Sequence, residues 1–118
     1  MVRGNKREIG TAYEKQAVLF LQRQGYDIVQ TNFRCRCGEI DIIAKDREYF
    51  VFVEVKYRSD IQSGSPLEAV DNQKQRKIIQ TAKYYLYSHG LGEEIPCRFD
   101  VIGICQNKIT LIRNAFEV

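Results

Sequence analysis

The feature that most constrains this fold is a run of β-branched and aromatic residues, Tyr49-Phe50-Val51-Phe52-Val53, which is followed by charges at Glu54 and Lys56. Such a run predicts a strand over residues 49–57. Apolar side chains on both of its faces place this strand in the centre of a sheet. Because side chains alternate between the two faces of a strand, Glu54 and Lys56 point the same way, about 7 Å apart. The strand therefore brings an acid and a base to one end of a buried sheet.

A second acid lies just upstream, at the end of the segment Gly38-Glu39-Ile40-Asp41. Residues 39–44 are predicted to form a strand, and a carboxylate within such an apolar strand is costly unless it is paired or bound to a metal. Only the polar residues 45–48 separate this strand from the next, which predicts a hairpin. In such a hairpin Asp41 and Glu54 are neighbours.

The remaining pattern predicts two helices and three further strands. Apolar residues at helical spacing predict helices over about residues 7–24 and 71–88. The other predicted elements are strands over 26–33, 97–105 and 108–113, a turn over 34–38, a polar loop over 59–66 and a short helical turn over 66–70. The order α-β-β-β-α-β-β indicates an α/β fold, with a mixed central sheet flanked by helices. The 118 residues suit a single domain.

Overall charge and hydropathy exclude some partners and allow others. The net charge is +3 and the isoelectric point about 8.7, which suits an anionic partner without requiring one. No apolar run has the length of a membrane span, and no apolar stretch follows the basic start of the chain. The sequence therefore predicts a cytoplasmic protein with no membrane partner.

The two acids and the lysine form a candidate metal centre. Two carboxylates about 5 Å apart repel by roughly 3 kcal/mol at an effective dielectric near 20. A divalent cation would offset this repulsion, and carboxylate oxygens favour Mg²⁺ or Mn²⁺ over zinc. A cation held by Asp41 and Glu54 could bind a phosphate oxygen and activate water, while Lys56 positions that water or stabilises the developing charge. The alternative is a structural ion pair between Lys56 and one of the acids.

Glu14 is a third candidate acid. It shares one face of the predicted first helix with Ala17 and Leu21, so it lies beside the apolar stripe of that helix. It would add a third carboxylate to the metal centre. The alternative is a surface glutamate paired with Lys15 or Arg7.

Several basic residues are candidates for contact with phosphate. Lys74 falls on the inward stripe of the second helix, from which it either reaches a phosphate or extends to water. Arg58 follows the central strand and either contacts a phosphate or pairs with a nearby acid. Arg34 and Arg36 lie within the predicted turn, and Glu39 either joins the acidic cluster or pairs with one of them.

Other polar residues are predicted to be structural. The lone histidine, His89, is expected to cap a helix or to be exposed. Asp100 is expected to pair with an arginine. The cysteines do not have the C-x-x-C spacing of a zinc knuckle, so we expect small buried residues or idle thiols. The alternative is an interaction domain that binds zinc through all four: Cys35, Cys37, Cys97 and Cys105.

These motifs resemble those of a known group of enzymes. Asp41 followed on the next strand by Glu54-Val55-Lys56 resembles the core of the PD-(D/E)XK nuclease superfamily, and Glu14 matches the helix glutamate of its Holliday-junction resolvase branch. Ile40 stands where proline is usual. More closely, nearly the whole chain resembles the YraN family of small bacterial endonuclease-like proteins. The matching segments are Gly10 to Ala17, Asn32-Phe33-Arg34, Gly38-Glu39-Ile40-Asp41, Phe52 to Arg58, Lys74 and Arg98-Phe99-Asp100-Val101.

The resemblance implies a restriction-endonuclease-like fold with Asp41, Glu54 and Lys56 as the catalytic set. With Glu14 added, it leads to the hypothesis of a Mg²⁺- or Mn²⁺-dependent, resolvase-like DNA endonuclease that acts in repair or recombination. Cutting both strands of a duplex would require a homodimer, since one small domain carries one site. The alternative is a nucleic-acid-binding module that keeps the fold without turnover. The structure of the substrate, and the choice between DNA and RNA, stay open.

Overall fold

The computed structural model describes residues 6–58, 70–92 and 94–117, with side chains from Ala12 onward. The predicted loop over 59–66 and nearly all of the short helical turn over 66–70 lie outside the described residues. The chain forms, in order, α1 (Lys6–Arg23), β1 (Asp27–Cys35), β2 (Gly38–Asp46), β3 (Tyr49–Arg58), α2 (Asn72–Ser88), β4 (Cys97–Cys105) and β5 (Lys108–Phe116). This is the predicted order of elements and the predicted α/β fold class.

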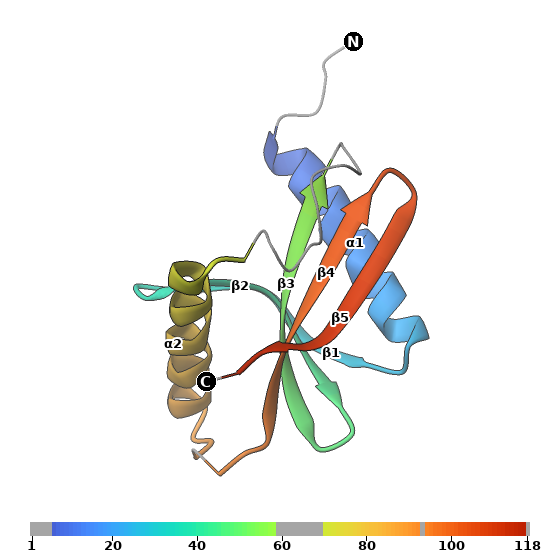
Figure 1. Ribbon diagram of the computed structural model, residues 1–118. Coiled ribbons are helices and arrows are strands. Elements are labelled where there is room, and N and C mark those ends of the chain that lie inside the picture. Colours follow the sequence, from blue (N-terminus) through green and yellow to red (C-terminus); the bar gives the residue numbers. More distant parts are fainter. Residues whose placement is uncertain (1–5, 59–69, 93, 118) are drawn as a thin grey trace.

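The five strands form one sheet in the order β1-β2-β3-β4-β5 (Figure 1). Neighbouring strands are antiparallel except β3 and β4, which run parallel and are joined through α2. A parallel pair needs such a crossover, because its strands begin at the same edge of the sheet. β3 is the middle strand, and the predicted burial of both its faces is confirmed at Val51, Phe52 and Val53.

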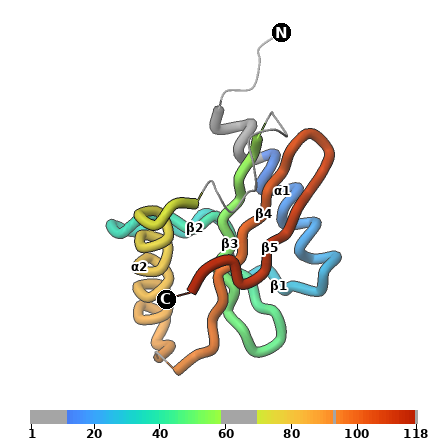
Figure 2. The backbone as a smooth tube through the Cα atoms, viewed as in Figure 1, coloured from blue at the N-terminus to red at the C-terminus, as the bar shows by residue number. Residues whose placement is uncertain are grey.

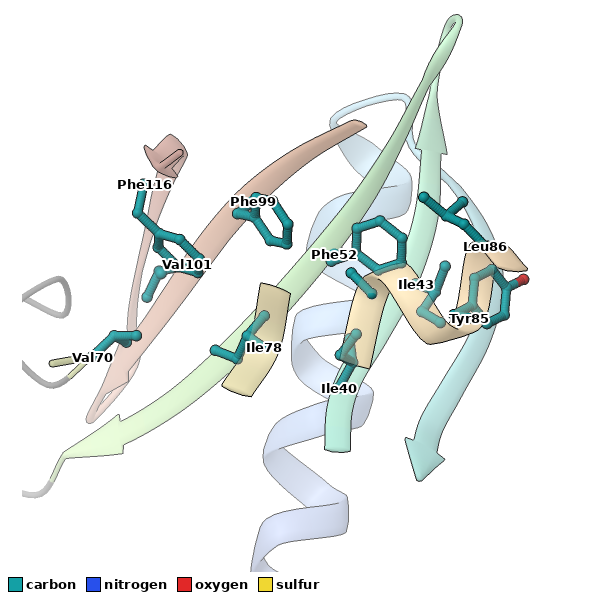
Figure 3. Packing of buried hydrophobic residues seen from close by; sticks show 11 residues of the cluster. Ile40, Ile43, Phe52, Val70, Ile78, Tyr85, Leu86, Phe99, Val101 and Phe116 are labelled. Carbon is teal, nitrogen blue, oxygen red and sulfur yellow. The ribbon is translucent and has the colours of Figure 1, made fainter. Parts of the chain in front are cut away.

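The two helices cover opposite faces of the sheet, so the protein has two apolar layers (Figure 2). On one face Tyr85 of α2 packs edge-on against Phe52 of β3, with ring centroids 6.0 Å apart. Figure 3 shows this layer, in which side chains of α2 project onto the sheet. On the other face Ala17 and Leu21 of α1 are fully buried. Among the described residues, no helix has the length and apolar character that crossing a membrane requires.

The ends of α2 are set by local hydrogen bonds. Asp71 caps the start of the helix, where its carboxylate accepts a hydrogen bond from the backbone N–H of Lys74 at 2.8 Å. His89 follows the last turn, and its ring nitrogen lies 2.8 Å from the carbonyl oxygen of Tyr85. The predicted capping role of His89 is therefore confirmed.

Most element ends fall within one residue of the prediction, but three strands continue two or three residues beyond their predicted ends, because each strand is longer than its apolar pattern. β1 continues to Cys35, so the turn to β2 contains only residues 36–37 instead of 34–38. β2 includes two of the four residues predicted as the connection to β3. β5 continues past residue 113 through an irregularity at Asn114, whose φ is +53° and whose N–H donates to Asp100 at 2.9 Å. That side-chain acceptor satisfies a backbone group that the strand ladder leaves free.

Candidate active site

The candidate site lies where β2 and β3 separate, a point that we call the fork. Pairing between these strands begins at their hairpin and ends at Ile42 and Val53. Beyond it, β3 stays paired with β4 as far as Arg58, while the start of β2 runs beside α2 (Figures 1 and 2). Gly38 permits this divergence, because a Cβ atom there would lie 3.1 Å from the Thr81 hydroxyl of α2. The fork therefore exposes backbone groups of β3 to side chains.

At the fork, the side chain of Asp41 supplies a hydrogen bond to β3 that a paired β2 backbone would otherwise supply. Its Oδ2 accepts a hydrogen bond from the backbone N–H of Val55 at 2.7 Å. A carboxylate in the middle of an apolar strand thus satisfies a buried donor that would otherwise have no strand partner. The side chain also hydrogen bonds to Glu54, so the predicted proximity of the two acids is observed.

The two acids hold one proton between them at neutral pH. Burial, followed by the hydrogen bond with Glu54 and the charge of Glu54, raises the pKa of Asp41 to about 9. Burial alone would raise the pKa of Glu54, but hydrogen bonds from Asp41 and Lys74 outweigh it and lower this pKa. Asp41 is therefore the protonated partner and Glu54 the ionised one.

Two lysines face the acid pair. Nζ of Lys74 lies 2.8 Å from Oε2 of Glu54, whose side chain is only 8% exposed. Lys74 also donates a hydrogen bond to Lys56. Burial and then this neighbouring cation lower the pKa of Lys56, whereas Glu54 and Asp41 oppose the shift only in part. Lys56 is thus the amine that gives up its proton more readily.

The pKa of Lys74 shifts in the opposite direction to that of Lys56. Burial would lower its pKa, but hydrogen bonding to Glu54 and Lys56, together with the negative charges of Glu54 and Asp41, raises it. The sequence placed Lys74 on the inward stripe of α2, which is where it lies. The contact between Lys74 and Lys56 was missed, because it depends on how α2 sits over β3 and leaves no local signal.

Glu14 approaches the fork from α1, and its side chain is partly buried, as the sequence predicts. Asn32 hydrogen bonds to its carboxyl group, and Glu14 contributes to the raised pKa of Asp41. Burial is the main cause of the raised pKa of Glu14 itself. Its Oε1 is buried without a hydrogen-bond partner in the described part of the protein. A buried carboxylate oxygen in this state is a candidate ligand.

The donor set fits a hard divalent cation. Asp41 and Glu54 supply adjacent carboxylate oxygens, and Mg²⁺ is commonly held by one or two carboxylates together with water and substrate phosphate. Within residues 6–58, 70–92 and 94–117, no three His, Cys, Asp or Glu side chains are close enough to form a ready-made metal cluster. Asp41 and Glu54 are therefore the two residues that would hold such an ion, and Glu14 lies near enough for its charge to act on Asp41.

A zinc site built on all four cysteines is ruled out by the fold. Cys97 and Cys105 stand at opposite ends of β4, about 26 Å apart at the usual rise of a strand. Cys35 and Cys37 flank the turn between β1 and β2. All four thiols are free.

The other predicted polar residues divide between surface and structural positions. Arg34 pairs with Glu39 at 3.3 Å on the surface, so Glu39 does not join the acid pair. Arg36 is exposed in the turn that follows β1, and Arg58 is partly buried at the end of β3. Asp100 is fully buried and forms the predicted ion pair with an arginine, Arg98, at 3.0 Å.

Comparison with known proteins assigns the chain to a family. The sequence model of the uncharacterised protein family UPF0102 matches residues 13–104, a span that contains the whole fork. The chain belongs to UPF0102. A UPF0102 protein of Lachnoclostridium phytofermentans is 51% identical over 96% of both chains. One from Coxiella burnetii is 44% identical over 95% of this chain and 94% of the relative. One from Clostridium botulinum is 42% identical over 95% of this chain and 96% of the relative.

These UPF0102 relatives match nearly the full chain, which confirms the predicted resemblance to the YraN family. Their names state the family and no activity.

Proposed function

We propose that this UPF0102 protein is a Mg²⁺- or Mn²⁺-dependent nuclease that hydrolyses phosphodiester bonds of DNA, with a resolvase-like role in repair or recombination. The observation that carries the proposal is the acid pair of Asp41 and Glu54 at the fork, which shares one proton beside the readily deprotonated Lys56. Two acids and an amine with shifted pKa values in one place are typical of a catalytic centre.

The acids are assigned to metal binding. Asp41 and Glu54 would hold the cation directly, and Oε1 of Glu14 would reach it through water. When bound, Mg²⁺ or Mn²⁺ neutralises charge on the phosphate and lowers the pKa of a water molecule. Binding requires the proton of Asp41 to leave, so metal affinity rises with pH over the range below about 9.

Lys56 is assigned to proton transfer. In its neutral form its amino group accepts a proton from the attacking water while the new O–P bond forms and the bond to the leaving oxygen breaks. Lys74 favours this neutral form, because its own positive charge lies next to Lys56. Lys74, which contacts Glu54, would stabilise the added negative charge. Arg58, at the end of β3, and Arg34 and Arg36, near the turn after β1, would contact the phosphates of DNA.

A cleavage panel tests this proposal. Branched, single-stranded and duplex DNA are incubated with the native protein, Asp41→Asn or Lys56→Ala, in Mg²⁺, Mn²⁺ or EDTA. We expect metal-dependent cleavage by the native protein and a loss of about 100-fold or more in each variant. Glu39→Gln is the matched control, because Glu39 lies in the same strand but pairs with Arg34 on the surface. Native protein that cuts no faster than Asp41→Asn on every substrate would refute the proposal.

One observation favours a second candidate, a nucleic-acid-binding module without turnover. The 2.8 Å ion pair between Lys74 and Glu54 occupies an oxygen that a metal would use. In that case the acids are held by Lys74, and DNA binding falls steeply with salt but does not respond to Mg²⁺. The two candidates are separated by measuring DNA affinity with and without Mg²⁺, alongside the cleavage panel.

Double-strand cleavage by a domain with one site requires two copies. We therefore propose a homodimer on DNA. Sedimentation of the protein–DNA complex that shows a single protein chain per site would count against it.

A further inference from the structure

The face of α2 that points away from the sheet carries a continuous row of exposed side chains. Their spacing of three or four residues places them on one side of the helix, opposite the buried Ile78, Ala82 and Tyr85. We call this row the outer stripe. It consists of Arg76, Lys77, Gln80, Lys83, Tyr84 and Tyr87.

The outer stripe is positively charged, and no acidic side chain of α2 neutralises its charge. α2 contains no acidic residue. Arg76, Lys77 and Lys83 take part in no ion pair within the described residues. A row of unpaired cations on a helix of one charge sign is complementary to a polyanion.

The same row holds two exposed aromatic rings. The side chain of Tyr84 is 47% exposed and that of Tyr87 is 82% exposed. Tyr84 rests against Phe33 of β1, with ring centroids 6.4 Å apart, which steadies one edge of its ring. Lys83 is four residues before Tyr87 and is therefore its neighbour on the helix surface. Alternating cations and exposed rings are typical of surfaces that bind phosphates and stack unpaired bases.

The first turns of α2, where the outer stripe begins, lie next to the fork. Lys74, one turn before Lys77 on the same helix, forms the ion pair with Glu54. From Lys74 to its end at Ser88 the helix extends for about 21 Å. A nucleic acid strand lying along the exposed side of α2 would therefore have one end beside the fork.

We propose that the outer stripe binds single-stranded nucleic acid and leads it to the fork. Arg76, Lys77 and Lys83 contact the phosphates, and unpaired bases stack on Tyr84 and Tyr87. A duplex would satisfy the cations but would leave both rings without a base to stack on. This inference rests on the proposed function and narrows its substrate class to DNA with an unpaired segment beside the cleaved bond.

The first test measures binding without cleavage, in EDTA, from the fluorescence anisotropy of a labelled oligothymidylate of about 20 nucleotides and of a duplex of equal length. We expect Tyr84→Ala/Tyr87→Ala to weaken single-strand binding about tenfold or more and duplex binding less than twofold. The single variant Tyr87→Ala is measured as well, because this exposed side chain makes little contact with the core and its loss should leave the fold intact. Leu19→Ala, which removes a 53% exposed apolar side chain from α1, is the control.

The second test concerns charge. Lys83→Glu should weaken single-strand binding and reduce the slope of log affinity against log salt by about 0.7 or more. Arg23→Glu makes the same change on α1, at the opposite face of the sheet, and should leave the affinity within about twofold of native. Tyrosine variants that bind oligothymidylate like the native protein, or an equal effect of Arg23→Glu, would overturn the inference.

The two proposals fail in different ways. Asp41→Asn should abolish cleavage and keep native single-strand affinity, because the outer stripe is intact. If native protein cuts no DNA but the tyrosine variants lose single-strand binding, the nuclease is refuted and the outer stripe is retained. If the native protein cuts and the tyrosine variants bind and cut unpaired DNA like it, the outer stripe is refuted and the nuclease is retained.

Discussion

The carboxyl group of Asp41 has two roles at the fork. One oxygen accepts a hydrogen bond from the backbone N–H of Val55, and the carboxyl group also shares a proton with Glu54. The first role is structural and the second is electrostatic, so a neutral substitute can keep one and remove the other. Asparagine is such a substitute, because its amide oxygen accepts a hydrogen bond and its amide nitrogen donates one.

This separation predicts how the stability of the metal-free protein depends on pH. Asp41 loses its proton near pH 4 in the unfolded chain but only near pH 9 in the folded protein. Between these values the unfolded chain binds fewer protons, so the free energy of unfolding falls as pH rises, by at most about 1.4 kcal/mol per pH unit. Asp41→Asn should show a flatter dependence and be the more stable protein at pH 8. Thermal unfolding in EDTA from pH 5 to 9 measures this.

Glu48→Gln, an exposed change in the turn between β2 and β3, is the control for that series. If the stability of the native protein and that of Asp41→Asn changed with pH in parallel, Asp41 would be ionised in the folded state.

At the scale of elements, the fork exists because the start of β2 approaches α2 closely. Gly38 has a φ of +153°, and any Cβ atom there would be 3.1 Å from Thr81. The strand 97–105 was predicted with its observed ends, because its apolar run is bounded by polar residues. The approach of Gly38 to Thr81 was not predicted, since the packing of a helix on a strand far away in sequence has no local pattern.

Gly38→Ala should therefore lower the free energy of unfolding by about 1–3 kcal/mol, because the added methyl group strains the backbone and presses on Thr81. Urea unfolding measures the change. Gly92→Ala is the matched control, since its nearest neighbour would be 4.0 Å away, and it should change stability by less than about 0.5 kcal/mol. Equal effects of the two variants would mean that the close approach at Gly38 is not required.

At the scale of the whole molecule, a polar network around the buried Asp100 links residues that lie far apart in the sequence. Arg98 of β4 bonds to Asp100 in the same strand, to Asp46 of β2 and to the hydroxyl of Tyr26. That hydroxyl donates to Asp100 at 2.7 Å. The pairing of Asp100 with an arginine was predictable from the cost of a buried carboxylate. The partners Asp46 and Tyr26 were not, because they lie more than 50 positions away and are brought close only by the sheet.

Asp100→Ala should destabilise the protein by about 3 kcal/mol or more, because it removes one of the two carboxylates that Arg98 contacts and leaves the N–H of Asn114 without its acceptor. Asp100→Asn, which keeps one acceptor oxygen, should cost less. Asp27→Ala removes an exposed aspartate of β1 as the control and should have little effect. The midpoint of chemical unfolding gives the comparison, and a cost for Asp100→Ala as small as that of Asp27→Ala would exclude a structural role for the network.

The central claim is that the acid pair at the fork holds a catalytic divalent cation, and calorimetric titration with Mn²⁺ tests it most directly. We predict that the native protein and Glu39→Gln bind one ion per chain at the same affinity, and that Asp41→Asn binds at least about tenfold more weakly. Binding by the native protein that is no tighter than binding by Asp41→Asn would contradict the claim.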